Sequence, residues 1–266
     1  MHSLFGYPEL ASEHGPALDR VNDYVHWLML ILFVLWTALF LYMLVRFRKK
    51  KNPKADYHGL KSHVSNYAEV GVAIAEVILL VGFSIPLYSD RVDDLPAEEE
   101  SVVARVYAQQ FAWNIHYPGP DGVFGRTTID LVDESSNPIG LDRDDPMAKD
   151  DVVTLNQLHV VKDRPALIYL TSKDVIHSFA LWEMRVKQDA IPGMMFPVWF
   201  IPTMSSAEMM ERNGHGFEIG CAQLCGNSHY SMRGQMTVHT QAEFDTWMDA
   251  EQEDLGVRRQ VNDIWG

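Results

Sequence analysis

Hydrophobic residues near the N-terminus form two long, nearly unbroken runs. Val25 to Val45 is 21 residues long and is interrupted mainly by His26 and Thr37. As a helix it would be about 32 Å long, enough to cross the hydrocarbon core of a bilayer. A second run extends roughly from Tyr67 to Tyr88. The pattern therefore predicts two transmembrane helices, at 25–45 and 67–88.

The connection between these runs is basic. Residues 46–61 contain seven Lys or Arg and one acid, Asp56. The positive-inside rule places such a connection in the cytoplasm, so both ends of the hairpin lie outside. We expect an external segment over 1–24 and a cytoplasmic loop over 46–66. In a bacterium, the domain that follows would face the periplasm.

From Val102 the hydrophobic pattern changes to short β-branched or aromatic runs separated by turn residues. Many short strands of this kind predict an antiparallel sandwich or barrel, here over 95–240. A helical period appears at 241–255 and predicts an acidic surface helix there. We treat residues 241–266 as an acidic C-terminal helix or tail. The expected strands are 102–107, 111–117, 152–158, 166–170, 175–181, 217–221 and 235–239.

Charge is distributed unevenly along the chain, whose formal net charge is -14. Residues 1–89 are nearly neutral, whereas residues 90–266 hold 14 Lys or Arg against 29 Asp or Glu. An acidic domain would repel nucleic acid, which we exclude as a partner. The negative electrostatic field of this domain favours a basic protein partner. The need to keep the domain soluble would also account for its acidity.

The chemistry of the chain is concentrated in one stretch. Cys221 and Cys225 are the only cysteines, and His229 and Met232 follow them. Two thiolates, an imidazole and a thioether form a soft-ligand set that suits copper. The two cysteines alone would also permit a local disulfide, and Met232 alone would also serve as core filler.

A cupredoxin-type site takes one further histidine from a distant strand end, and His177 follows an apolar strand. His215 is the rival ligand, but its Asn-Gly-His-Gly setting indicates an exposed turn. A single blue copper needs only one cysteine. Two thiolates instead suit two bridged copper ions, each completed by one histidine. Met232 and a main-chain carbonyl near residue 223 would fill the weak axial positions. We expect His159 and His239 on strand surfaces.

Two acids lie in or near the second apolar run. Glu69 and Glu76 are seven residues apart and so share one helix face. Glu76 indicates a contact with another membrane protein. Glu69 fits either a proton path or a hydrated position at the headgroups.

Taken together, these motifs resemble subunit II of haem-copper cytochrome c oxidases. The matching pieces are the N-terminal hairpin, Asp174-Val-Ile-His177-Ser-Phe, Asp189-Ala-Ile-Pro-Gly193 and the motif at 221–232. The resemblance covers most of the chain in order. It implies a cupredoxin-like Greek-key domain and a bacterial inner-membrane protein with both termini on the periplasmic side.

The resemblance further implies a dinuclear copper centre, CuA. It would accept single electrons from cytochrome c, free or in a donor complex, and pass them to haem in subunit I. Oxygen is reduced to water there and protons are pumped. Glu69 matches a glutamate at the proton-uptake entrance of the family. The implied ligands are His177, Cys221, the Gln223 main-chain carbonyl, Cys225, His229 and Met232.

The chain departs from the family pattern at several positions. The family usually has a magnesium-binding Glu between the cysteines, and the neutral Gln223 here counts against a magnesium site. The electron-entry motif, usually Gln-Trp-x-Trp, contains Phe111 and Trp113. Glu76 occupies a usual proline position. An apolar loop over 196–202 would face a partner or the membrane surface.

Three other classes of protein share part of this pattern. Quinol oxidase subunits II lack the copper ligands, and nitrous oxide reductases lack the membrane hairpin. A membrane-tethered copper chaperone also uses Cys-x3-Cys and a distant histidine. Such chaperones usually have a thioredoxin-like βαβ pattern, which the many short strands here do not indicate.

Overall fold

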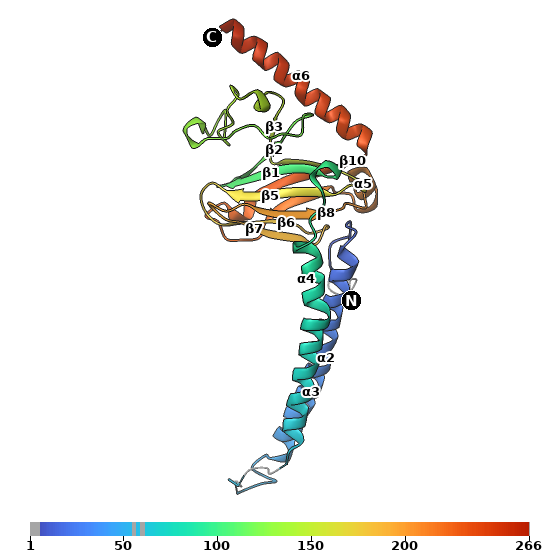
Figure 1. The fold of residues 1–266 in the computed structure, drawn as a ribbon. Coiled ribbons are helices and arrows are strands. Elements are labelled where there is room, and N and C mark those ends of the chain that lie inside the picture. The colour runs from blue at the N-terminus through green and yellow to red at the C-terminus, as the bar shows by residue number, and fades with distance from the viewer. Residues whose placement is uncertain (1–5, 55–56, 59–61, 266) are drawn as a thin grey trace. The chain divides into compact units, whose positions relative to one another are not determined.

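The computed structural model describes residues 6–54, 57–58 and 62–265, with side chains as far as residue 256. Asp56 and Lys61 of the basic connection lie outside the described residues. The chain forms two compact units. One contains residues 16–93, and the other combines residues 6–15 with the chain from residue 94 onwards. Figure 1 shows the elements of both.

The first unit consists of two long apolar helical segments. Helix α2 spans Gly15–Arg46, and a second segment spans Val64–Val92. Both are long and apolar enough to cross a membrane, and their apolar side chains are largely exposed. α2 begins ten residues before the predicted run because the polar residues ahead of Val25 continue the helix. The rings of Tyr24 and Phe83 make an edge contact with centroids 5.5 Å apart.

The second segment contains an irregular turn near its only proline. Helix α3 (Val64–Leu79) is followed by a π-helical turn, η1 (Leu80–Ser84), and by α4 (Ile85–Val92). Pro86 has no N–H for the preceding turn, and π turns adjust the helix at such points. The Ser84 hydroxyl donates to the Leu79 carbonyl at 3.2 Å.

The second unit is built from two five-stranded sheets, with strand orders β3-β2-β1-β5-β8 and β4-β10-β9-β6-β7. It therefore has the expected two-sheet β architecture. The pairings β1–β5 and β10–β4 are parallel, so the sheets are mixed rather than antiparallel. The strands are β1 (Val102–Gln109), β2 (Ala112–Tyr117), β3 (Val152–Leu155), β4 (Gln157–Val161), β5 (Ala166–Ser172), β6 (His177–Leu181), β7 (Val186–Ala190), β8 (Phe196–Phe200), β9 (Phe217–Cys221) and β10 (Arg233–His239).

Two α-helices and several short turns complete the described part of this unit. The longer helix, α6 (Gln241–Trp265), is at the C-terminal end. Helix α5 (Ser206–Asn213) begins with a capping box, in which the side chains of Ser205 and Glu208 each accept the backbone N–H of the other residue. Helix α5 is not among the expected elements, although Ser205-Ser-Ala-Glu208 is a capping-box pattern. The single 3₁₀ turns are η2 (Glu98–Glu100), η3 (Ile129–Leu131), η4 (Pro146–Lys149) and η5 (His229–Ser231).

Two expected segments fold differently. Residues 152–158 form β3 and β4 in different sheets because the chain turns at Asn156, whose φ is 58°. Asparagine tolerates this left-handed conformation, and its side chain accepts the Trp113 N–H at 2.8 Å. The apolar residues after 195 form the edge strand β8 rather than a loop. Pro197 fits there because an edge strand need not donate on its outer side.

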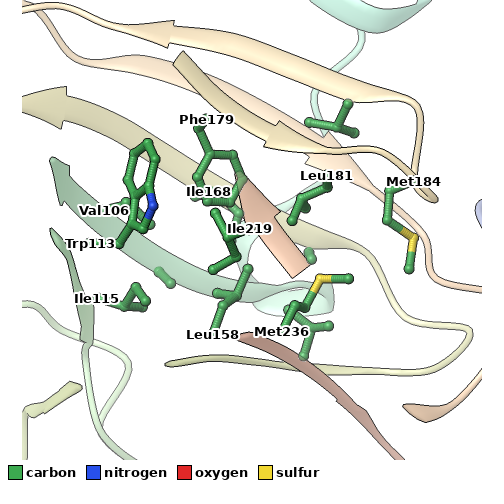
Figure 2. Packing of buried hydrophobic residues seen from close by; sticks show 14 of the residues in the cluster. Val106, Trp113, Ile115, Leu158, Ile168, Phe179, Leu181, Met184, Ile219 and Met236 are labelled. Carbon is green, nitrogen blue, oxygen red and sulfur yellow. The ribbon is translucent and has the colours of Figure 1, made fainter. Parts of the chain in front are cut away.

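The core lies between the two sheets, and both contribute to it (Figure 2). Strand β1 alternates buried and partly buried positions along its whole length, as expected for a strand with one face on a core. Burying each large apolar side chain contributes about 1.5–3 kcal/mol. The labelled core residues are Val106, Trp113, Ile115, Leu158, Ile168, Phe179, Leu181, Met184, Ile219 and Met236.

Candidate metal centre

The predicted ligands meet at one edge of the β unit because three strands end or begin there. His177 is the first residue of β6, Cys221 is the last of β9, and β10 begins just after Met232. Antiparallel pairing of β6 with β9 places Cys221 opposite Phe179. This register brings His177 to Cys221, although 44 residues separate them.

The side chains converge on the two cysteines. Cys221 Sγ lies 3.9 Å from His177 Nδ1, 3.8 Å from Cys225 Sγ and 3.2 Å from the Gln223 carbonyl oxygen. Cys225 Sγ lies 3.6 Å from His229 Nδ1 and 3.8 Å from Met232 Sδ. Both thiols are free, so the alternative of a local disulfide is not realised. Each cysteine thus has its own histidine.

This donor set fits a soft metal ion. The ligand atoms of His177, Cys221 and Cys225 all lie within 4.8 Å of one another. Metal–sulfur bonds of about 2.3 Å and metal–nitrogen bonds of about 2.0 Å allow donors at these separations to share an ion. Thiolate, imidazole and thioether ligands favour copper over hard cations. The residues present are therefore consistent with a copper site.

Three of the donor residues are removed from water, whereas Cys221 and His229 are partly buried. Exposure is 0% for His177, 4% for Cys225 and 1% for Met232. Burial, together with the neighbouring Cys221, raises the pKa of the Cys225 thiol to about 11. A bound cation reverses this preference because it stabilises the thiolate directly. The surroundings of Cys225 therefore favour a thiol or a metal-bound thiolate over a free thiolate.

A carboxylate behind the donors orients His177. Nε2 of His177 donates to Asp174 Oδ1 at 2.8 Å, which leaves Nδ1 directed at Cys221. Burial opposes ionisation of Asp174, but hydrogen bonds from His177 and the Gln110 and Val175 amides hold its pKa below the usual value. Such carboxylate–histidine pairs fix the ring of a metal ligand. Asp174 belongs to the motif 174–179, but its residue type and spacing alone do not indicate this role.

The predicted electron-entry residues, Phe111 and Trp113, also lie next to the donor group. Trp113 is 0% exposed, and its ring makes an edge contact with that of His177, centroids 6.1 Å apart. Phe111 is partly buried, and a Cβ added at Gly226 would lie 3.0 Å from its ring. Phe111 therefore contacts the loop that carries the cysteines. Glu69 is an exposed residue of α3.

Three other histidines that the sequence brought into consideration, His159, His215 and His239, lie outside the donor group. His215 is exposed in the turn before β9, as expected, and its ring is 3.0 Å from the Gly216 carbonyl. His159 is not a surface residue, which corrects that expectation. It is 8% exposed, with its Nδ1 2.8 Å from His239 Nε2, and Trp247 of α6 stacks on it. The strand pattern alone does not predict that α6 covers His159.

Comparison with known proteins gives consistent matches. The family model "Cytochrome C oxidase subunit II, periplasmic domain" matches residues 102–240. The "Alternative cytochrome c oxidase subunit 2" of Bradyrhizobium diazoefficiens is 28% identical over 258 residues, covering 97% of this chain and 88% of that protein. "Cytochrome c oxidase subunit 2" of Cereibacter sphaeroides is 26% identical, covering 88% of this chain and 78% of that protein.

A solved structure also matches. The periplasmic domain of subunit II of cytochrome oxidase (CoxB) of Bradyrhizobium japonicum is 25% identical, with a TM-score of 0.42, and covers 61% of this chain and 99% of that chain. The match to a periplasmic domain, together with the two apolar helices, indicates a membrane protein. Because the family model spans more than half of the chain and the relatives match almost all of it, the chain belongs to the cytochrome c oxidase subunit II family and is a subunit of a haem-copper oxidase complex.

Proposed function

We propose that this subunit is the electron-entry port of a proton-pumping terminal oxidase. It takes single electrons from a cytochrome c, free or in a donor complex, and delivers them to haem in subunit I for the reduction of oxygen to water. The observation that supports this most directly is the convergence of His177 with five donors of the stretch 221–232 at one edge of the β unit.

The donor set favours a dinuclear centre, CuA. A single blue copper takes one thiolate, two imidazoles and a weak axial ligand. This chain places two thiols side by side, with His177 and the Gln223 carbonyl beside Cys221, and His229 and Met232 beside Cys225. Cys221 and Cys225 would hold the copper together with these neighbours, and the bound copper would supply a one-electron redox centre. We include no magnesium ion, since Gln223 is neutral and exposed.

The chain's own residues keep the donors fixed. His177 and Cys221 lie in paired strands, and Met232 is held next to β10. Core residues back the donors on the inner side, including Phe179, whose ring contacts that of Trp113. A cage held by paired strands would change little between redox states, which favours rapid electron transfer. It leaves no place for a substrate.

Electron entry would occur on the Phe111 side. Trp113 is fully buried behind His177, whereas Phe111 is partly exposed and contacts the cysteine loop at Gly226. The negative charge of residues 90–266 would steer a basic donor protein to this domain. We propose that Phe111 takes the place of the tryptophan usual in the family's entry motif.

The orientation of the subunit follows from its charges. The basic connection between α2 and α3 would lie in the cytoplasm, and the β unit with both termini in the periplasm of a bacterial inner membrane. The exposed apolar surfaces of the two helices would contact lipid and other oxidase subunits, including subunit I. Glu69 would then lie near the cytoplasmic end of α3, where it is placed to serve proton uptake.

The test is metal analysis of the full chain. Purified in detergent and loaded with copper, it should bind two coppers per chain and give an electron paramagnetic resonance spectrum of one electron shared equally by both. One copper with a single blue thiolate band would defeat the dinuclear centre. For the oxidase role, the chain should copurify from membranes with a haem-bearing subunit I. Isolation of the chain from membranes without such a subunit would argue against the oxidase role.

A further inference from the structure

Gln110, in the turn between β1 and β2, contacts both loops that supply copper donors. Its main-chain N–H donates to Asp174 Oδ2 at 2.7 Å. Its side-chain amide donates to the Cys225 carbonyl at 2.6 Å. Since Asp174 in turn holds His177, one residue connects the histidine loop to the cysteine loop.

Cys225 needs such a contact because it lies beyond the strand ladder. The pairing of β6 with β9 covers Cys221, and a last bond joins the Ala222 N–H to the Ser178 carbonyl at 2.9 Å. Cys225 follows three residues later, in a loop that no regular ladder holds. The Gln110 side chain holds the main chain of Cys225 in place. Gln110 lies in the turn between β1 and β2, which belong to the other sheet.

The turn and the cysteine loop also fit together sterically at Gly226. Its φ is 137°, which L side chains rarely adopt. A Cβ at this position would lie 2.8 Å from Gln110 Nε2 and 3.0 Å from the Phe111 ring. Glycine therefore permits the close approach that lets Gln110 reach the Cys225 carbonyl, and it brings the Phe111 ring against the same loop.

We propose that Gln110 is a positioning residue that sets His177 and Cys225 relative to each other and holds Phe111 against the copper loop. This inference rests on the proposed function, since it concerns the same centre. Outer contacts of this kind typically change metal affinity or activity by about 10–100-fold when removed. Two hydrogen bonds from one residue to two ligand loops give Gln110 that role.

The test compares three variants of the full chain in detergent. Gln110→Ala removes the side-chain bond. Gln110→Glu keeps its length, but the carboxylate, ionised at neutral pH, has no N–H for the Cys225 carbonyl. Gln235→Ala, at an exposed position of β10, is the matched control. Copper affinity, reduction potential, the paramagnetic resonance spectrum and thermal melting with and without copper are measured for each.

Both Gln110 variants should bind copper about 10-fold more weakly and show altered copper hyperfine splitting and potential. Their metal-free melting should change little, because a positioning role acts on the loaded site. Gln235→Ala should match the wild type throughout. Equal destabilisation with and without copper, or wild-type affinity and spectrum in Gln110→Glu, overturns the inference. If the wild type itself binds no copper, the proposed function fails instead.

Discussion

At the scale of single residues, the two buried methionines of the β10 region show how similar side chains differ in role. Met232 is 1% exposed and lies 3.8 Å from Cys225 Sγ. Met236, four residues later, is 2% exposed and belongs to the apolar core. Both are flexible thioethers in the same core cluster, but only Met232 also lies beside a cysteine sulfur, which makes it the proposed ligand.

We predict that Met232→Leu keeps both coppers and raises the reduction potential. Leucine preserves most of the volume but offers no sulfur to stabilise the oxidised centre. Metal analysis and redox titration of the full chain measure the two effects. Met236→Leu is the matched control and should leave the potential unchanged. Complete loss of copper in Met232→Leu would show that Met232 is more than a weak axial ligand.

Several of the site residues were predictable because their chemistry is local. Cys221, Cys225, His229 and Met232 are recognisable from donor type and spacing alone. Gln110 and Gly226 were not assigned, since an exposed glutamine and a loop glycine carry no ligand signal. Their role depends on which turn lies against which loop, and that is a property of strand order.

At the scale of elements, helix α6 covers a pair of histidines, one in the middle of β4 and one at the end of β10. His159 and His239 stack with ring centroids 5.1 Å apart and share a hydrogen bond of 2.8 Å. Trp247 of α6 stacks on His159 at 4.0 Å. Burial, and then the neighbouring His239, lowers the pKa of His159 to about 4. Burial also lowers the pKa of His239, whereas Glu243 on α6 raises it.

We predict that α6 docks less tightly as the pH falls. His159 is neutral in the docked state, and its pKa returns towards 6.5 when exposed, so undocking takes up a proton. The stabilisation is complete above about pH 6.5 and decreases towards pH 4, by a few kcal/mol in all. Amide hydrogen exchange of residues 241–256, corrected for the pH dependence of the intrinsic exchange rate, should show protection factors that decrease at low pH.

His159→Phe supplies the comparison for this experiment. Phenylalanine keeps an aromatic ring beneath Trp247 but does not titrate, so the pH dependence of exchange should become much shallower. His215→Phe, at an exposed turn, should retain the wild-type dependence. An unchanged pH dependence in His159→Phe would place the titrating group elsewhere.

At the scale of the whole molecule, the N-terminal segment 6–15 folds as part of the β unit. Ala11 is fully buried in its core, and its N–H donates to the Glu183 carbonyl at 2.9 Å. The Ser12 hydroxyl donates to the Met184 carbonyl at 2.7 Å. The β domain is therefore not complete from residue 95 onwards, and the segment ahead of α2 is structural.

We predict that Ser12→Ala lowers the free energy of unfolding of the β unit by about 1 kcal/mol, the usual value of a buried hydrogen bond. Chemical denaturation of the full chain, followed by a probe in the β unit, measures the change. Glu13→Ala alters an exposed neighbour in the same segment and should have little effect. Equal stability of Ser12→Ala and the wild type would show that the segment contributes little.

The sequence by itself determined the two apolar spans, the mainly β domain and the soft-donor chemistry, because hydrophobic period and ligand type are local properties. Only the tertiary structure decided which distant groups meet. Pairing of β6 with β9 brings His177 to Cys221, and the β1–β2 turn brings Gln110 to Cys225. Likewise, packing of α6 buries His159, and the N-terminal segment enters the β unit. These contacts depend on strand order and packing, which no short stretch of sequence encodes.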